Sequence, residues 1–282
     1  MSKIRAKKAL DMFLSQPKKF KHIYGPVSSW RLGRSLGVDM LSADKKACTF
    51  DCIYCQLGSY AEKTIKRTCY IPTAEIIQEI KNLPRGTKID YITFSGRGEP
   101  ALAKNIGETI RAIKKISKKK IAVITNASLM RYKDVRKDLS FADLVVAKMD
   151  AYSEKSFRKI NKPAKGIKFK DVVGGLKAFG KAHKGRFALQ IMFVPQNKKH
   201  FKEMAEIAYA IQPDEIEINT PTRPNPIKPL SKDDILKITA YFRALNKKPA
   251  LKTKIISLYE SVRKNASAIS REATIKRRGA VK

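Results

Sequence analysis

Acidic residues, cysteines and long apolar runs are all scarce in this chain of 282 residues. No run of about 18 or more apolar residues occurs, which argues against a membrane-spanning helix. Residues 1–19 are basic but lack the apolar stretch and the small-residue cleavage site of a secretory signal, so we expect a cytoplasmic protein with no membrane partner. Four cysteines do not form a disulfide scaffold in a chain this long.

The shortage of acidic residues leaves a large positive charge. Sixty Lys and Arg residues stand against 25 Asp and Glu residues, for a formal charge of +35. The excess is spread along the chain and includes both of its ends. Such a surface attracts polyanions, nucleic acid first among them, so RNA is an expected partner. The alternative is that the lysines serve only solubility.

Short apolar runs alternate with amphipathic stretches from residue 35 onward. This alternation predicts an α/β fold of parallel strands joined by right-handed helical crossovers. Six such units are too few to close an eight-stranded barrel, so we predict a partial (β/α)6 barrel with ligands at the carboxyl ends of its strands. The predicted strands are Ser35–Met40, Tyr91–Ser95, Ile121–Thr125, Leu144–Lys148, Phe187–Val194 and Glu215–Asn219.

The helices and chain ends complete the predicted organisation. Thr73 is predicted to cap one helix, and Ser231 to cap another that runs to about Leu245. Ile255–Tyr259 has the pattern of one more strand. We therefore divide the chain into a basic N-terminal segment (1–34), the partial barrel (35–225) and a C-terminal helix and strand extension with a basic tail (226–282).

Three cysteines crowd into eight residues after the first predicted strand: Cys48, Cys52 and Cys55, with the spacing C-x3-C-x2-C. Three thiolates on a 4Fe–4S cluster leave one iron without a protein ligand. S-adenosylmethionine (SAM) can chelate that iron through its amino and carboxylate groups. An electron passed through the cluster then breaks the adjacent sulfonium bond and yields a 5′-deoxyadenosyl radical. The alternatives are a four-cysteine zinc site completed by Cys69, or a cluster that Cys69 caps fully.

This cysteine motif resembles that of the radical SAM superfamily, and the resemblance extends from Tyr24 to Asn225. Tyr54 stands where that family has an aromatic residue whose neighbourhood contacts adenine, although it can also be a packing residue. The segment Gly96-Arg97-Gly98-Glu99 resembles the glycine and glutamate motif that holds the SAM amino group. The resemblance implies reductive SAM cleavage, with an electron donor such as flavodoxin or ferredoxin.

Polar residues at the ends of later strands are further candidates. Asn126 is a candidate partner of the SAM ribose hydroxyls or a turn residue that closes its strand. Lys148 either pairs with the SAM carboxylate or is solvated. Asp150 is expected to cap the following helix rather than to orient the ribose. Arg223 suits a phosphate or a carboxylate.

Residues 24–39 are the most distinctive segment after the cysteines. They resemble a subgroup of radical SAM proteins related to the tRNA wyosine synthases. In this segment Arg31 and Arg34 either reach a substrate phosphate or belong to a lid. Wyosine synthases carry further cysteines upstream for a second cluster, whereas this chain has none before Cys48. The resemblance therefore implies the fold, the cluster and SAM, but not the wyosine reaction.

These features together predict a radical SAM enzyme that modifies RNA, with tRNA as the expected substrate. One alternative is an activase or maturase that acts on another protein, and another is an RNA-binding protein with structural zinc. These assignments predict two experimental outcomes. Gly98→Val should block SAM binding without loss of iron, and truncation from Arg271 should weaken RNA binding without affecting SAM cleavage.

Overall fold

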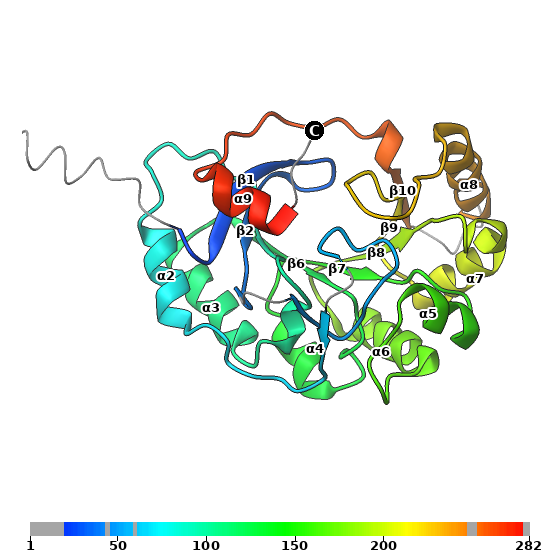
Figure 1. Cartoon of the computed structure of the whole chain (residues 1–282), viewed down its shortest axis with the longest axis horizontal. Coiled ribbons are helices and arrows are strands. Elements are labelled where there is room, and N and C mark those ends of the chain that lie inside the picture. Colours follow the sequence, from blue (N-terminus) through cyan, green and yellow to red (C-terminus); the bar gives the residue numbers. More distant parts are fainter. Residues whose placement is uncertain (1–19, 43–45, 59–60, 247–252, 279–282) are drawn as a thin grey trace, which may run out of the picture.

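A computed structural model describes residues 20–42, 46–58, 61–246 and 253–278, which form a curled sheet flanked by helices (Figure 1). The basic residues predicted at the two chain ends lie in part outside the described residues, within 1–19 and 279–282. The sheet has eight strands, which from edge to edge are β1 (Ile23–Ser29), β2 (Gly33–Val38), β5 (Tyr91–Phe94), β6 (Lys120–Thr125), β7 (Leu144–Lys148), β8 (Arg186–Met192), β9 (Glu215–Asn219) and β10 (Lys254–Ser257).

The strands of this sheet are parallel except at one edge, where β1 runs antiparallel to β2. The sheet curls without closing, so the predicted partial barrel is confirmed (Figure 1). The one strand of this sheet that the sequence did not indicate is β1, because Gly25 and Pro26 interrupt its pattern. Proline is tolerated there because β1 is an edge strand. A separate small sheet pairs β3 (Lys46–Cys48) with β4 (Ala61–Lys63).

Within the described ranges, seven α-helices follow the outer side of the curled sheet (Figure 1). They are α2 (Thr73–Lys81), α3 (Ile106–Ile116), α4 (Lys133–Leu139), α5 (Glu154–Ile160), α6 (Phe169–Ala182), α7 (Phe201–Ile211) and α8 (Lys232–Leu245), and single turns of 3-10 helix lie at Pro100–Leu102, Lys198–His200 and Leu258–Glu260. No helix in the described ranges is long and apolar enough to cross a membrane.

The helix caps match the prediction at one of two positions. Ser231 caps α8, because its side chain accepts a hydrogen bond from the Asp234 backbone N–H. The predicted cap at Thr73 is wrong, since α2 begins after Pro72 and has no side-chain cap. The Thr73 hydroxyl instead lies 2.9 Å from the Thr109 hydroxyl on α3, so it joins two helices.

The core lies between the sheet and the outer helices. On α3, Ile106, Ile110 and Ile113 are fully buried and recur at helical spacing. Burial of each such side chain contributes about 1.5–3 kcal/mol to folding. This packing holds the strands rigidly, so their carboxyl ends form a fixed base for a site.

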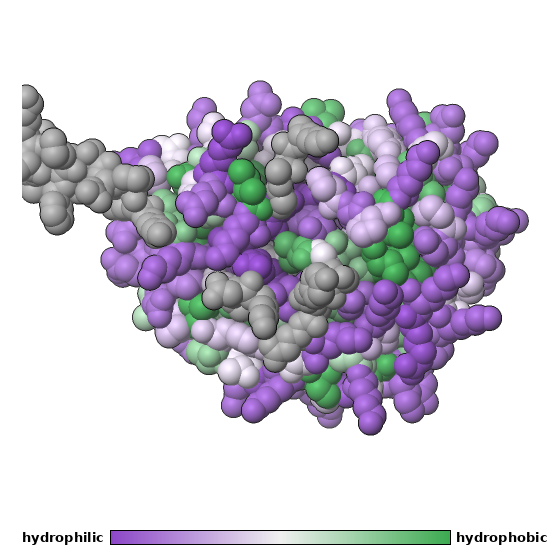
Figure 2. Space-filling view, viewed as in Figure 1, coloured by the Kyte–Doolittle hydropathy of each residue, from purple (hydrophilic) through white to green (hydrophobic). Residues whose placement is uncertain are grey.

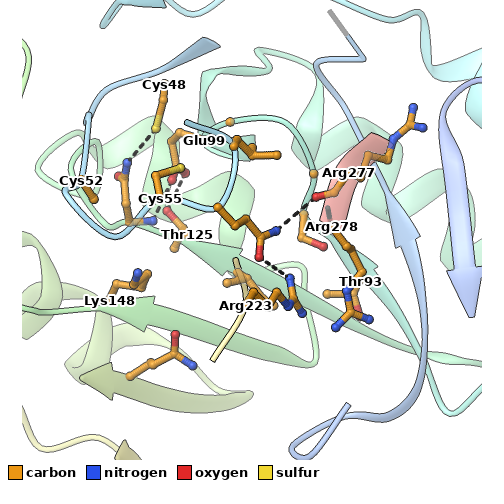
Figure 3. A pocket seen from close by; sticks show the side chains of 18 of the residues that line it. Cys48, Cys52, Cys55, Thr93, Glu99, Thr125, Lys148, Arg223, Arg277 and Arg278 are labelled. Atoms are coloured by element: carbon orange, nitrogen blue, oxygen red, sulfur yellow. Dashed lines mark hydrogen bonds between the residues drawn. The ribbon is translucent and has the colours of Figure 1, made fainter. Parts of the chain in front are cut away.

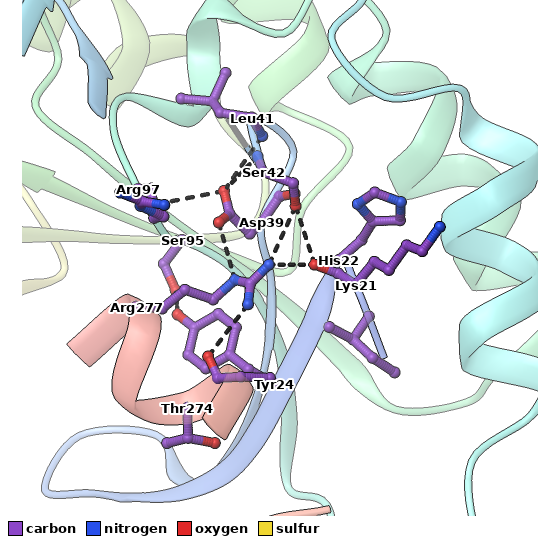
Figure 4. A network of polar contacts seen from close by, with 12 residues as sticks. Lys21, His22, Tyr24, Asp39, Leu41, Ser42, Ser95, Arg97, Thr274 and Arg277 are labelled. Carbon is purple, nitrogen blue, oxygen red and sulfur yellow. Dashed lines mark hydrogen bonds and ion pairs between the residues drawn. The ribbon is translucent and has the colours of Figure 1, made fainter. Parts of the chain in front are cut away.

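The last described helix, α9 (Arg271–Arg278), lies away from the outer helices and packs against β1 (Figure 1). Its Arg277 side chain is buried, and the guanidinium Nε donates to the Asp39 carboxylate at 2.9 Å. Arg277 also donates to the Lys21 carbonyl and to the Ser42 hydroxyl (Figure 4). The three backbone N–H groups that donate to the other Asp39 oxygen belong to Leu41, Ser42 and Arg97.

Loss of the Arg277 guanidinium should destabilise the fold strongly. The side chains of Arg277 and Asp39 are 3% and 1% exposed, so Arg277→Met leaves a buried carboxylate without its cation. We expect the free energy of unfolding to fall by about 3–5 kcal/mol in urea titrations. Arg243→Met is the matched control, because its pair with Glu260 is exposed and should contribute about 1 kcal/mol or less. Equal losses in both variants would contradict this prediction.

Candidate active site

A cavity of about 300 Å³ lies at the carboxyl ends of the central strands. Its wall combines the cysteine loop that follows β3, the ends of β5, β6 and β7, and residues of α9 (Figure 3). The structure brings together in this one cavity all nine residues predicted for the cluster and for SAM: Cys48, Cys52, Cys55, Tyr54, Gly96, Gly98, Glu99, Asn126 and Lys148.

The three cysteines of the motif are partly buried and open onto the cavity. Side-chain amides approach two of the sulfurs, with Asn126 Nδ2 at 3.6 Å from Cys48 Sγ and Asn161 Nδ2 at 3.4 Å from Cys52 Sγ. Burial raises the pKa of Cys48 to about 12 and also raises the pKa of Cys52. These two thiols are therefore protonated at neutral pH without a metal, and metal binding must displace their protons.

The donor set suits a cluster better than a single zinc ion. Cys69 is exposed, is not among the residues that line the cavity, and points its thiol at the Ile71 carbonyl at 3.7 Å. Zinc needs four ligands around one point. Three thiols around an open cavity, with amide donors to two of the sulfurs, fit a cluster of several irons with one iron left open.

Glu99 lies at the base of the cavity and is buried. Its carboxylate accepts from the Thr125 hydroxyl at 2.6 Å and from the backbone N–H groups of Ala101 and Asn126 at 3.0 and 2.7 Å. Burial raises the pKa of Glu99, and these hydrogen bonds offset only part of that rise. Glu99 thereby ties the end of β5 to the end of β6.

Tyr54 and Lys148 form a second polar group on the cavity wall, with Asp150 buried behind them. The Tyr54 hydroxyl donates to Asp150, and Lys148 Nζ lies 2.9 Å from that hydroxyl and 3.5 Å from the Asp150 carboxylate. Lys148 is therefore paired rather than solvated, with a side chain 19% exposed. The predicted helix cap at Asp150 is wrong, because Ser153 caps α5. Asp150 instead accepts from the backbone N–H of Met192 at the end of β8.

Asn126 serves as a turn residue and also reaches the cysteine loop. Its Oδ1 accepts from the Ser128 backbone N–H at 3.0 Å, which closes the turn after β6. Its Nδ2 donates to the Thr49 hydroxyl at 2.6 Å, next to Cys48. Asn126 is therefore a turn residue, as one of the two alternatives predicted. Its side chain also lines the cavity.

Gly98 packs against the cysteine loop itself. A Cβ atom at this position would lie 1.6 Å from the Ala47 carbonyl oxygen and 2.6 Å from the Leu41 side chain. The Glu99 backbone N–H donates to that same carbonyl at 3.1 Å. The glycine is therefore required for the approach of the loop that carries Cys48, and not only for space near a ligand.

Comparison with known proteins agrees with this geometry. The model of the radical SAM superfamily matches residues 45–208. The chain belongs to the radical SAM superfamily. It is therefore an enzyme of that superfamily, for which a 4Fe–4S cluster and SAM are implied.

Several curated proteins are similar to this radical SAM enzyme. A UPF0026 protein of Synechocystis is 39% identical over 210 residues, which cover 74% of this chain and 78% of that protein. A UPF0026 protein of Methanocaldococcus jannaschii is 34% identical over 238 residues, 81% of this chain and 73% of that protein. A Brachyspira hyodysenteriae protein named GTPase Obg is 37% identical over 233 residues, and the match covers 80% of this chain but 34% of that protein.

Solved structures share the fold of this radical SAM enzyme. TYW1 with a lysine-pyruvate adduct bound has a TM-score of 0.56 at 17% identity, over 75% of this chain and 73% of that chain. The structure of anSMEcpe with bound AdoMet has a TM-score of 0.57 at 17% identity, over 80% of this chain and 64% of that chain. At these identities the likeness concerns the fold alone.

The two arginines of the distinctive N-terminal segment lie in different surroundings. Arg31 lines the cavity of the radical SAM enzyme, and its Nη1 lies 3.3 Å from the buried Glu217 carboxylate. Arg34 does not line the cavity, and instead pairs with Asp90 through two guanidinium hydrogen bonds of 3.1 and 2.8 Å. These bonds hold the pKa of Asp90 below its usual range.

Arg34→Gln should therefore alter stability and not ligand binding. We expect a loss of about 1 kcal/mol or less at pH 7, because the pair is partly exposed. A lowered carboxyl pKa contributes stability above its ordinary value near 3.9, and that contribution fades as the pH falls through the lowered value. The difference between wild type and variant in urea titrations should thus shrink below about pH 4. A variant of unchanged stability that binds substrate more weakly would contradict this assignment.

Several residues that line the cavity of this radical SAM enzyme were not predicted from the sequence. Thr93 and Ser95 lie at the end of β5. The strand-end rule that selected Asn126 applies to them equally, so they were within reach of prediction. Arg277 and Arg278 were not, because only the docking of α9 onto β1 brings them to the cavity.

Proposed function

We propose that this chain holds a 4Fe–4S cluster on Cys48, Cys52 and Cys55 and uses it to cleave SAM reductively. The observation that carries this proposal is that all three thiols open onto one cavity at the strand ends. When bound, the cluster supplies an open iron for SAM and the electron that breaks the sulfonium bond. The amides of Asn126 and Asn161 near two sulfurs support thiolate ligands, because hydrogen bonds to sulfur stabilise the charged form.

The cavity wall offers a matching group for each polar part of SAM. We assign the SAM ammonium group to the backbone carbonyls and carboxylate of the Gly96–Glu99 segment, and the SAM carboxylate to Lys148. Asn126 is assigned to the ribose hydroxyls and Tyr54 to the neighbourhood of the adenine. These groups come from four different strand ends or loops, so together they orient one bound molecule.

Anaerobic reconstitution tests this proposal. The full chain should bind iron and sulfide at about four each per chain, and with SAM and dithionite it should form 5′-deoxyadenosine and methionine. A sample without reductant is the control. Stoichiometric zinc without sulfide, and no SAM cleavage after reconstitution, would favour the zinc alternative.

We further propose that the substrate is RNA, with tRNA first among candidates. The formal charge of +35 supports a polyanionic partner. Hydrophilic side chains also cover most of the face that carries α9 (Figure 2). The resemblance of residues 24–39 to relatives of the tRNA wyosine synthases points the same way.

Two measurements test the RNA substrate. Binding of a tRNA transcript should weaken steeply with salt, and each phosphate contact should add roughly 0.7–0.9 to the slope of log affinity against log salt. The tRNA of a deletion strain should lack one modified nucleoside. A flat salt response together with an unchanged nucleoside profile would favour a protein substrate. Truncation from Arg271 is not a clean test, contrary to expectation, because it removes Arg277 and Arg278 from the cavity wall.

A further inference from the structure

The cavity is strongly basic. Six basic residues line it, against Glu99 as the one acidic residue in that wall. Four of the six lie within 4 Å of a carboxylate: Arg31 with Glu217, Lys46 with Asp51, Lys148 with Asp150 and Arg277 with Asp39. Two arginines, Arg223 and Arg278, remain.

Arg223 and Arg278 have no acidic partner within the part of the chain that the structure describes. Arg223 follows β9, and its Nη1 donates to Gln56 Oε1 at 2.7 Å. The Nε atom of Arg278 is buried without a hydrogen-bond partner. Gln56 also donates to the Arg277 carbonyl at 3.2 Å, so one side chain links the cysteine loop to Arg223 and to α9. Figure 3 shows both arginines across the cavity from Cys48 and Cys52.

The two guanidinium groups repel each other. Burial, together with the positive charges of Arg278, Arg31 and Arg263, lowers the pKa of Arg223 to about 9. Burial also lowers the pKa of Arg278. Like charges gathered in a buried place cost free energy unless an anion compensates them. No described side chain supplies that anion, so the arrangement favours a ligand that does.

We propose that Arg223 and Arg278, with Arg31 beside them, bind a phosphate group of the substrate. A guanidinium fork matches phosphate oxygens in two parallel hydrogen bonds, and two guanidinium charges without a carboxylate partner suit an anionic phosphate group. Arg223 contacts Gln56 beside Cys55, and both arginines lie across the cavity from Cys48 and Cys52, so a molecule held by its phosphate enters the same cavity as the cysteines (Figure 3). The inference rests on the proposed function only in naming that molecule the substrate.

Tryptophan fluorescence of the iron-free full chain can test the phosphate site. Trp30 is the one tryptophan, and the Arg31 guanidinium lies 5.1 Å from its ring centre. Uridine 5′-monophosphate should bind and uridine should not. Arg223→Ala and Arg278→Ala should each weaken the monophosphate roughly tenfold to a hundredfold, because each removes a charge-assisted pair. Arg278→Lys should recover part of the loss. The matched control is Arg85→Ala, which removes one charge from an exposed turn outside the cavity.

Three results would overturn the proposal. One is equal binding of uridine and its monophosphate, and another is an Arg85→Ala loss as large as the others. The third is a greater loss of affinity for SAM than for the monophosphate in reconstituted Arg278→Ala protein, which would assign the arginines to the SAM carboxylate. A 5′-hydroxyl RNA hairpin carries only phosphodiesters and no terminal phosphate. Binding of this hairpin through the same arginines would identify RNA as the phosphate source, whereas binding of the monophosphate alone would identify a free nucleotide. Wild-type protein that binds the monophosphate through these arginines but forms no 5′-deoxyadenosine would refute the proposed function alone.

Discussion

Alanine in place of Cys48, Cys52 or Cys55 should abolish both the brown iron–sulfur chromophore and the formation of 5′-deoxyadenosine. With only two thiolates left, a second iron loses its protein ligand and the cluster is no longer held. The cavity wall offers no replacement thiol, since Cys69 does not line it. Iron and sulfide analysis, the visible absorption spectrum and chromatography of the SAM products measure the outcome.

Cys69→Ala is the matched control for the cysteine variants. It removes one exposed thiol and should retain both the chromophore and SAM cleavage. The assignment of ligands is wrong if Cys69→Ala loses the cluster while any variant of the triplet keeps it.

Gly98→Val should lose most of its iron, and not SAM affinity alone. The new Cβ would stand 1.6 Å from the Ala47 carbonyl oxygen, a backbone atom that cannot rotate away. The strand β3 must then move, and with it Cys48 at its end. The geometry contradicts the simpler expectation of a steric block to SAM in an iron-replete protein. Iron content after reconstitution, set beside the far-ultraviolet circular dichroism spectrum, measures the effect.

Gly174→Val provides a control for the glycine variant. A Cβ at Gly174 meets no atom within 4 Å, so the same substitution on α6 should leave iron content unchanged. A folded Gly98→Val protein with full iron and weakened SAM binding would restore the earlier interpretation.

The central strands and the cysteine motif could be predicted because both depend on local pattern. Buried parallel strands are continuous apolar runs, and three closely spaced cysteines lie on one loop whatever the rest of the chain does. The carboxyl-end rule then placed Asn126 and Lys148 on the same cavity. Nothing in a local pattern shows which helix will dock across that cavity. For this reason only the structure shows that α9 places Arg277 and Arg278 at the cavity.

The sequence also could not show which charged or backbone group each polar side chain contacts. Arg31 and Arg34 are three positions apart and look alike in the sequence, yet one faces the cavity and the other pairs with Asp90. Asp150 was assigned to a cap by its position before a helix, whereas Ser153 takes that role. Such side chains follow the nearest opposite charge or open backbone group in three dimensions.

The bond between Asp39 and Arg277 joins residues 238 positions apart in the chain. At translation rates of about 5–20 residues per second, Arg277 is made roughly ten to fifty seconds after Asp39. For most of that interval the cysteine loop has been made, whereas α9 has not. Until α9 is made, the cavity lacks the wall that Arg277 and Arg278 form. Delivery of iron and sulfide during synthesis would meet less obstruction than delivery to the finished protein.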